Sequence, residues 1–336
     1  MKSISSLRIA SLTVLTASVI VLSIAVTYAQ VSSLGIHFIR VQQEKVHLEM
    51  MQGNAGNPWQ YRILADALID PLIKLVKGLG VPQPESFTFI GFRFLQCIFV
   101  LVAAGVYYRR LGLSFYESLI GLSILAWSMS FSLYNSDLSF NVFFDVAFYL
   151  LAAILILDRK YLWLVLLMVP AALNRETSIL IPFMLFFATG KNPGNEEGRA
   201  RRLIAPAVAL AIFVIVFVGL RLYYGPQQFL TADGYFPGIG LLLLNLKRAV
   251  TWEQLAITLG IIPVLALCTF RAWPRTLRIF FWVVVPVWIV VHSGAALVAE
   301  TRLLLVPQAL VFIPGALSEL MSTRRAATQD ATTVTS

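Results

Sequence analysis

Three polar residues interrupt a long apolar run in the middle of the chain. Asn174, Arg175 and Glu176 stand between the apolar stretches Tyr161–Leu173 and Thr177–Thr189. At ~1.5 Å per residue, an arm of about 13 residues makes roughly 20 Å of helix, which is shorter than the ~30 Å hydrocarbon core of a bilayer. If the two arms form a hairpin, its charged turn lies inside the membrane profile. Charge at that depth is costly and indicates a functional site.

Other charged residues are expected at a similar depth. Asp145 lies about two turns inside its apolar run, roughly 10 Å from the outer end, and Arg93 interrupts another run in the same way. If these faces converge, four arginines meet three carboxylates and one positive charge remains. A phosphate ester would balance that charge, because the guanidinium fork matches phosphate oxygens. The arginines are Arg93, Arg175, Arg221 and Arg302, and the carboxylates are Asp145, Glu176 and Glu300.

Each candidate also has a structural explanation. Asn174 can cap the following helix, where Glu176 would favour the helix dipole. Arg93 can pair with Asp145 in a bridge that has no chemical role. Arg221 and Arg302 can be interfacial residues, and His292 can simply stand at a helix end. Glu44 and Glu49 can belong to a solvated polar face.

The composition excludes a soluble domain. The 336 residues are 58% hydrophobic and 13% charged, with a mean hydropathy of +0.80, as in polytopic membrane proteins. Cys97 and Cys268 both lie in apolar runs and resemble small core residues. The sequence has no Cys/His cluster and no glycine-rich phosphate loop, so we predict no metal site and no certain cofactor. A divalent metal has no support from the sequence.

We predict an all-α fold with about ten spans and both termini cytoplasmic, in a single transmembrane domain over 1–325. In this topology the inner segments hold more than half of the Lys and Arg but about a third of the Asp and Glu. The net charge of +9 is therefore a positive-inside signal, and nucleic acid is excluded as a partner. Basic clusters before Tyr161 and after Thr189 place both ends of the hairpin inside. The spans are 8–29, 86–108, 115–134, 138–157, 160–173, 176–190, 203–224, 252–270, 279–293 and 303–320.

The largest outer segment is 30–85, between the first two spans. We expect a short amphipathic helix over 41–51, a turn over 54–58, and a second helical stretch over 61–79 that Pro71 kinks or divides. Such helices lie along the membrane surface. The first span is read as uncleaved, and the small polar residues of 326–336 indicate a disordered cytoplasmic tail.

Four short motifs resemble those of bacterial GT-C-type integral membrane glycosyltransferases. They are Phe143–Val146 around Asp145, Leu173–Ser178, Glu300–Leu304, and Gln60–Leu64 in the first outer loop. This resemblance covers most of the chain. It implies an enzyme of the bacterial inner membrane that transfers a sugar from a polyprenyl-phosphate carrier to an acceptor at the outer face. The bilayer and the lipid-linked donor are its expected partners.

The resemblance also implies roles for residues. Carboxylates serve near the anomeric carbon and arginines near the leaving phosphate, and a carboxylate of the first outer loop commonly acts as the base. The Asp expected just after the first span is missing, so the base stays open among Glu44, Glu49, Asp66 and Asp70. The catalytic candidates are Asp145, Glu49, Glu176 and Glu300, and the substrate-binding candidates are Arg62, Arg93, Asn174, Arg175, Arg221, His292 and Arg302.

Two other function classes fit the same residues. A transporter or flippase for a lipid-linked or anionic substrate also places charge inside the membrane, although such proteins hold it near the midplane and are built from repeats. A non-catalytic scaffold with a transferase-like fold would explain the missing Asp. A structure in which Glu49, Asp145 and Glu176 lie far apart, with no shared cavity, would favour the scaffold.

Overall fold

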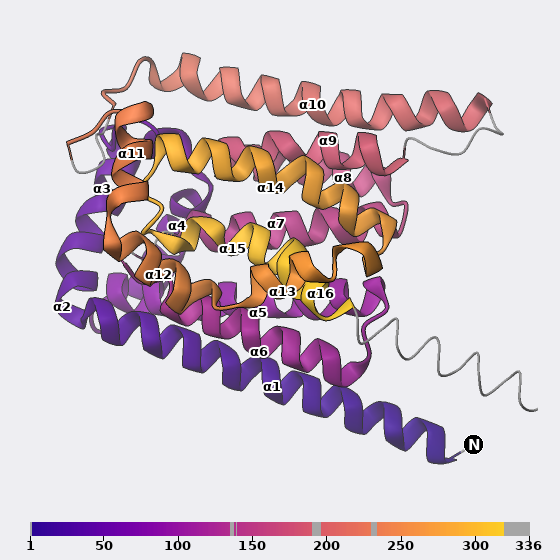
Figure 1. The fold of residues 1–336 in the computed structure, drawn as a ribbon. Helices are drawn as coiled ribbons and strands as arrows, with labels where there is room; N and C mark the ends of the chain where they lie inside the picture. Colours follow the sequence, from indigo (N-terminus) through magenta and orange to yellow (C-terminus); the bar gives the residue numbers. More distant parts are fainter. Residues whose placement is uncertain (1, 135–137, 139, 190–195, 230–233, 319–336) are drawn as a thin grey trace, which may run out of the picture.

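The computed structural model describes residues 2–134, 138, 140–189, 196–229 and 234–318. The predicted tail over 326–336 lies outside these ranges. Within them the chain forms helices and turns, with one isolated bridge between Asn57 and Phe229 and no strand. The all-α prediction is confirmed. The helices run side by side along one axis, except at one end of the bundle, where several shorter ones lie (Figure 1).

Five helices of the described residues are long and apolar enough to cross a membrane, so the chain is a helical membrane protein. Their spanning portions are Ser11–Leu34, Pro84–Leu111, Phe140–Leu157, Leu203–Tyr224 and Arg275–Ala295. A sixth candidate is the broken pair Ala249–Leu259 and Ile262–Cys268, which bends by 70°. Four shorter apolar helices lie at the positions of the other predicted spans, and the count of ten stays a prediction: Phe115–Phe131, Tyr161–Asn174, Glu176–Thr189 and Thr301–Ala316.

The elements follow in this order. The first half contains α1 (Lys2–Leu34), α2 (Ile36–Phe38), η1 (Ile39–Gln43), α3 (Glu44–Gln52), η2 (Trp59–Tyr61), α4 (Leu64–Gly78), α5 (Pro84–Leu111), α6 (Phe115–Phe131), α7 (Phe140–Leu157) and α8 (Tyr161–Asn174). The second half contains η3 (Glu176–Ile179), α9 (Leu180–Thr189), α10 (Glu196–Tyr224), α11 (Ile239–Lys247), α12 (Ala249–Leu259), α13 (Ile262–Cys268), η4 (Phe270–Ala272), α14 (Arg275–Ala295), η5 (Thr301–Leu304), α15 (Leu305–Pro307), η6 (Gln308–Phe312) and α16 (Ile313–Ala316).

Helix α7 is the centre of the bundle. Its sequence is apolar on every face, which is the pattern of a helix buried on all sides, and most of its side chains are buried. It packs against α5, α8, α9, α15 and η6. Asp145 therefore sits on the most buried of the five long apolar helices, with 1% of its surface exposed.

The first outer segment folds largely as its sequence predicts. The amphipathic stretch 41–51 falls within η1 and α3, and Gly53 ends α3 with a positive φ of 82°. The second stretch forms one helix, α4, which continues through Pro71. The prediction that Pro71 starts a second helix is therefore wrong, because α4 forms without a break at that residue.

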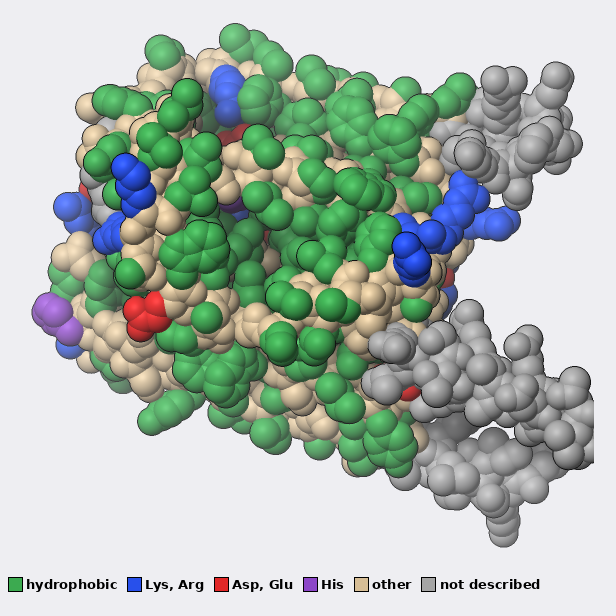
Figure 2. Space-filling model, viewed as in Figure 1, with side chains coloured by type: hydrophobic (Ala, Val, Ile, Leu, Met, Phe, Trp, Pro, Cys, Tyr) green, Lys and Arg blue, Asp and Glu red, His purple; other side chains and the backbone are tan. Residues whose placement is uncertain are grey.

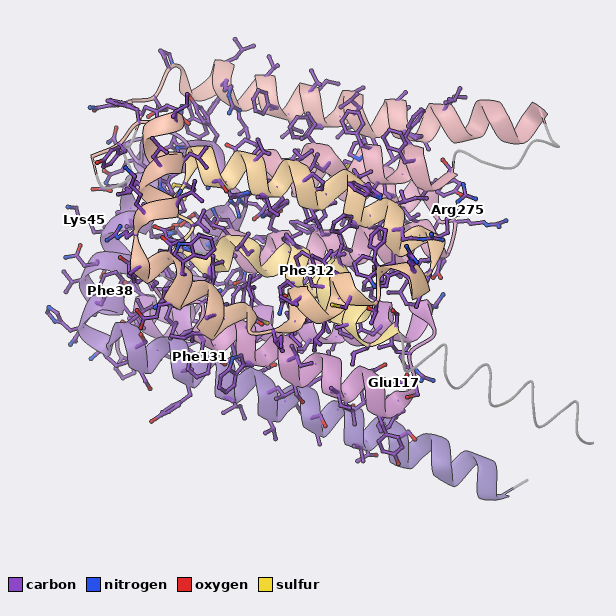
Figure 3. All side chains as sticks on the ribbon, viewed as in Figure 1. Phe38, Lys45, Glu117, Phe131, Arg275 and Phe312 are labelled. Atoms are coloured by element: carbon purple, nitrogen blue, oxygen red, sulfur yellow. The ribbon has the colours of Figure 1, made fainter. Side chains whose placement is uncertain are left out.

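The two ends of the bundle separate the segments assigned to opposite membrane sides. Phe38 and Lys45 lie at one end, whereas Glu117 and Arg275 lie at the other, with the N-terminus of α1 (Figures 1 and 3). Glu117 completes a capping box with Ser114 at the start of α6, which explains an acidic residue near that end. The space-filling surface between the ends is mainly apolar (Figure 2).

Cysteine labelling tests the predicted orientation. Lys45 and Arg275 are exposed at opposite ends, and Cys97 is buried while Cys268 is exposed. In a Cys268→Ser background, we expect a membrane-impermeant maleimide to label Lys45→Cys in intact cells. Arg275→Cys should react only after the membrane is permeabilised. The opposite pattern would invert the topology.

Candidate functional site

The turn between α8 and α9 places its polar residues inside the protein. Helix α8 ends at Asn174, Arg175 is extended (φ −157°, ψ 149°), and Glu176 starts the short helix η3 that leads into α9. The predicted break at these residues is confirmed. Asn174 and Arg175 are 0% and 3% exposed, so the turn is a buried structural unit.

Asn174 does not cap the second helix. Its side-chain amide donates a hydrogen bond to the carbonyl oxygen of Asn141, on α7, at 2.8 Å. Arg175 occupies the cap position of η3 and makes no side-chain cap bond there. The capping explanation of Asn174 is therefore wrong, because its amide is used to attach the turn to α7.

Arg175 and Asp145 form a buried ion pair. Nη1 of Arg175 lies 3.3 Å from Oδ2 of Asp145, and their side chains are 4% and 1% exposed. Thr177 donates its hydroxyl to the same carboxylate, at 3.0 Å from Oδ2. The phenol of Tyr149, one turn further along α7, donates to the carbonyl oxygen of Thr177 at 2.5 Å. These contacts hold the turn in register with α7.

His292 supports the other side of the Arg175 guanidinium. Its Nδ1 lies 2.9 Å from the carbonyl oxygen of Trp288, one turn earlier on α14, so this nitrogen carries the proton. The second ring nitrogen, Nε2, then accepts from Nη2 of Arg175 at 3.5 Å. The imidazole also stacks on the Trp288 ring, with 4.8 Å between centroids. Arg175 is thus oriented from both α7 and α14.

A second group of charges surrounds Glu176. Nη2 of Arg62 lies 3.0 Å from Oε2 of Glu176, and Nη2 of Arg221 lies 3.8 Å from Oε1. Arg62 also lies over the ring of Trp59, and Arg221 over Phe217, at 5.4 and 3.4 Å from the ring centroids. Glu176 therefore joins the first outer segment to the end of α10.

Glu300 and Arg302 complete the cluster on the connection after α14. They pair at 2.8 Å between Oε2 and Nη2. The indole of Trp288 donates to the carbonyl oxygen of Leu303 at 2.6 Å, which attaches η5 to α14. Asn245, on α11, bonds to backbone groups of Ser293, near the end of α14, and of Ala296 and Val298, in the connection that follows. Helices α11 and α14 together with η5 thus determine where Arg302 lies.

These residues surround a cavity of about 410 Å³, which we name the arginine cavity. A hollow between α14 and α15, beside α11, shows blue basic and purple histidine side chains within it (Figure 2). The cavity is lined by Pro58, Trp59, Arg62, Asn141, Val142, Arg175, Glu176, Thr177, Val291, His292, Ala295, Ala296, Leu297, Glu300, Arg302 and Leu303.

Most of the predicted site residues gather at this cavity. Arg62, Arg175, Glu176, His292, Glu300 and Arg302 line it. Asp145, Asn174 and Arg221 lie directly behind it through the contacts above. Arg62 belongs to this cluster, whereas Arg93, which the predicted charge balance included, does not. Among the described residues the cluster contains four arginines and three carboxylates.

Two predicted residues lie elsewhere. Arg93 is buried beside the Phe140 and Phe143 rings, 5.1 and 4.2 Å from their centroids, and does not line the arginine cavity. The expected Arg93–Asp145 bridge is replaced by the Arg175–Asp145 pair. Glu49 is a half-exposed residue of α3, 3.8 Å from Lys45, and it also lies outside the cavity.

A smaller cavity adjoins the arginine cavity and is lined by Asp66, one of the four acids among which the sequence leaves the base open. Its volume is about 30 Å³, and it shares Trp59, Arg62 and Asn141 with its larger neighbour. Asp66 lines it, and Oδ1 of Asp66 lies 2.8 Å from Nδ1 of His47. Because these two residues are 19 positions apart on separate helices, their spacing gives no signal of a pair.

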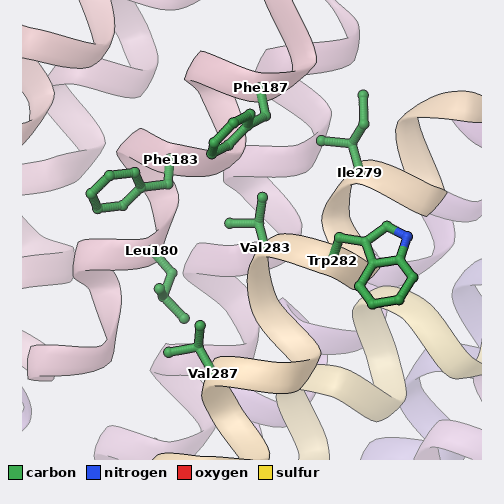
Figure 4. A pocket seen from close by; sticks show the side chains of 7 residues that line it. All are labelled: Leu180, Phe183, Phe187, Ile279, Trp282, Val283 and Val287. Carbon is green, nitrogen blue, oxygen red and sulfur yellow. The ribbon is translucent and has the colours of Figure 1, made fainter.

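A third cavity is apolar and lies between α9 and α14. This groove, of about 450 Å³, is lined by Leu180, Phe183, Phe187, Ile279, Trp282, Val283 and Val287 (Figure 4). Several of these side chains are exposed, including 52% of Phe187 and 64% of Trp282. Leu180 and Val287 lie together at one end of it (Figure 4).

This groove leads toward the arginine cavity. Val291, which lines the arginine cavity, is one helical turn beyond Val287 on α14, and Thr177 is one turn of chain before Leu180. An elongated molecule could therefore place a polar end among the arginines and an apolar end between α9 and α14.

The described residues contain no group of three or more His, Cys, Asp or Glu side chains that could hold a metal ion. No family model matches the chain, and no curated protein and no solved structure matches it either. The resemblance to GT-C-type enzymes therefore rests on the four short motifs alone.

Proposed function

We propose that the protein is a membrane glycosyltransferase that takes its sugar from a polyprenyl-phosphate donor. The observation that carries the proposal is the arginine cavity, in whose described lining three arginines accompany two carboxylates and whose wall lies one turn of α14 from an apolar groove. A phosphate attached to a long hydrocarbon complements both parts. In this proposal the cavity faces the outer side of a bacterial inner membrane.

The arginines suit a leaving phosphate. When the bond between the sugar and the phosphate breaks, negative charge grows on the phosphate oxygens and positive charge on the anomeric carbon. Donors that are fixed before the reaction stabilise such charge without reorganisation. Arg175 is held by Asp145 and His292, and Arg302 by Glu300. Both guanidinium groups line the cavity in which the phosphate would lie.

The apolar groove suits the hydrocarbon of the donor. Its side chains belong to α9 and α14, and Phe187 and Trp282 are exposed there, so that a hydrocarbon chain can reach them from outside the protein. Burying a hydrocarbon there contributes about 0.8 kcal/mol per methylene group. A tail in this groove and a phosphate among the arginines would orient the sugar toward Trp59, Asn141 and Arg62.

The two alternative classes have less support. A transport pathway needs polar groups through the depth of the protein, whereas the described buried Glu117 at the other end is a helix cap. A scaffold predicts that Glu49, Asp145 and Glu176 lie far apart and share no cavity. Of the three, Glu176 lines the arginine cavity and Asp145 is bonded to Arg175, which also lines it, whereas Glu49 lies outside. This argument against a scaffold therefore covers Asp145 and Glu176 alone.

Substitution of the buried ion pair tests the proposed function. Asp145→Asn keeps the shape of the side chain, and Arg175→Ala removes the candidate phosphate contact. We expect each to lower sugar transfer by ~10²–10³-fold, since donors to a developing anion contribute on that scale. The assay measures transfer of radiolabelled sugar from a panel of farnesyl-phosphate sugars to membranes of the source cell.

The matched control is Arg40→Ala, which removes an exposed arginine of the outer segment. It should retain full activity. Loss of one partner of a buried pair can cost ~3–5 kcal/mol of stability, so size-exclusion profiles in detergent accompany each assay. Arg302→Gln gives a second test that leaves the buried pair intact. Full transfer by folded Asp145→Asn, Arg175→Ala and Arg302→Gln would contradict the proposal.

Filling the groove tests the position of the lipid tail. Val287→Trp places a large ring at the end nearest the arginine cavity. We expect the KM for a long-chain polyprenyl donor to rise about tenfold, which is ~1.4 kcal/mol of lost binding, with little change in kcat. A donor with a very short chain should be affected less.

The control for this experiment is Ile215→Trp, at an exposed position of α10 away from the groove. It should leave both donors unaffected. An equal rise in KM for long and short chains, or none for either, would show that the tail lies elsewhere.

A further inference from the structure

The surface of the protein carries a groove that the proposed function does not use. It has a volume of about 380 Å³ and is lined by Leu155, Lys160, Trp163, Leu166 and Leu167. Lys160 directly precedes α8, whereas Asn174 and the arginine cavity lie at the opposite end of that helix. We name this feature the lysine groove.

One face of α8 forms most of the lysine groove. Lys160, Trp163 and Leu167 are three and four residues apart, so their side chains lie on the same face of the helix. Leu155, on α7, completes the lining. At ~1.5 Å per residue, the groove extends roughly 10 Å from the lysine along the apolar part of α8. It therefore has a charged end and an apolar length.

The charge at the end of the groove is available to a ligand. Lys160 is 58% exposed, and its Nζ lies 3.9 Å from Oδ2 of Asp158. The Asp158 carboxylate also accepts a hydrogen bond from Arg110, at the end of α5, and Arg159 stands beside it in the chain. One carboxylate thus faces several basic residues at this turn and does not neutralise them. An anion that approaches Lys160 from outside the protein meets a positive field.

The order of groups along the groove matches the order of groups in a bilayer phospholipid. Basic side chains are attracted to anionic head groups at the membrane surface, indole rings favour the interface just below them, and leucines favour the hydrocarbon. Lys160, Trp163 and Leu167 follow one another in this order. A zwitterionic head group carries its own cation beside the phosphate, so it gains less from the lysine.

We propose that the lysine groove binds a bilayer phospholipid with an anionic head group. The lipid phosphate contacts the ammonium of Lys160, the glycerol region lies beside the indole of Trp163, and an acyl chain lies along the leucines. The lipid thereby packs against the connection between α7 and α8. This site is separate from the arginine cavity, and it does not depend on the proposed function.

Fluorescence quenching by brominated lipids measures which lipid lies against Trp163. The full-length protein is reconstituted in vesicles of equal parts phosphatidylglycerol and phosphatidylcholine, with bromine on the acyl chains of one lipid at a time. The signal of Trp163 is the difference between each protein and the same protein with Trp163→Phe. We expect phosphatidylglycerol to be favoured about fivefold beside Trp163, since one basic residue at a membrane surface contributes on that scale.

Two substitutions of the lysine separate charge from shape. Lys160→Gln should remove most of the preference for phosphatidylglycerol, because Arg110 and Arg159 do not line the groove. Lys160→Arg keeps the charge and should retain the preference. The matched control is Arg275→Gln, which removes an exposed basic residue outside the groove, at the end of the bundle that also contains Glu117 (Figure 3). It should leave the quenching of Trp163 unchanged.

Three results would overturn the inference. The first is equal quenching of Trp163 by the two brominated lipids in the wild-type protein. The second is a preference that Lys160→Gln leaves intact. The third is a preference that Arg275→Gln reduces as much as Lys160→Gln does, because that would show a general attraction of anionic lipid to the basic end of the bundle. None of these measurements involves sugar transfer, so the proposed function stands or falls separately.

Discussion

The ion pair between Asp145 and Arg175 is the interaction on which the site depends. Two charges buried among apolar helices, Asp145 on α7 and Arg175 in the turn after α8, are expensive to desolvate. The Thr177 hydroxyl and the His292 imidazole reduce that cost. Each of these bonds needs a particular placement of α7, the turn after α8, and α14. The charge pair therefore selects one arrangement of three elements that apolar packing alone would leave free to slide.

The arginines of the site lie at two depths in the bundle. Arg175 is held from behind and presents its remaining surface to the arginine cavity, whereas Arg62 and Arg302 come from connecting segments at the end of the bundle. Asn174 and Asn245 bond backbone groups rather than charges. Arg175 is thus fixed by the helices, and the other two arginines are carried by the segments that connect them. Binding groups on loops are commonly positioned by a rigid scaffold in this way.

Much of this architecture could be predicted from the sequence, because burying charge in an apolar environment costs free energy and therefore occurs at few positions. An apolar stretch too short to cross the bilayer and a carboxylate inside a span both indicate buried charge, and Arg175, Glu176 and Asp145 were found in that way. Arg93 shows the same signal, yet aromatic rings of α7 surround it. Hydropathy gives the depth of a residue but not the face of the helix on which it lies.

The residues that could not be predicted depend on contacts between distant segments. Asp66 and Arg62 are candidates from the sequence, but their pairings are not: Asp66 meets His47 on a separate helix, and Arg62 reaches Glu176 across 114 positions of the chain. Pro71 was expected to interrupt its helix, but α4 continues through it. Local preference is a weak guide where packing on α5 determines the outcome.

The central claim is that the arginine cavity binds a phosphate that carries a hydrocarbon chain. The most direct measurement is the binding of farnesyl phosphate and of uncharged farnesol to purified protein, compared with the Arg302→Gln variant. The account predicts that the phosphate binds the wild-type protein much more tightly than the alcohol and that Arg302→Gln removes most of this difference. Equal affinity for the phosphate and the alcohol in the wild-type protein would contradict it.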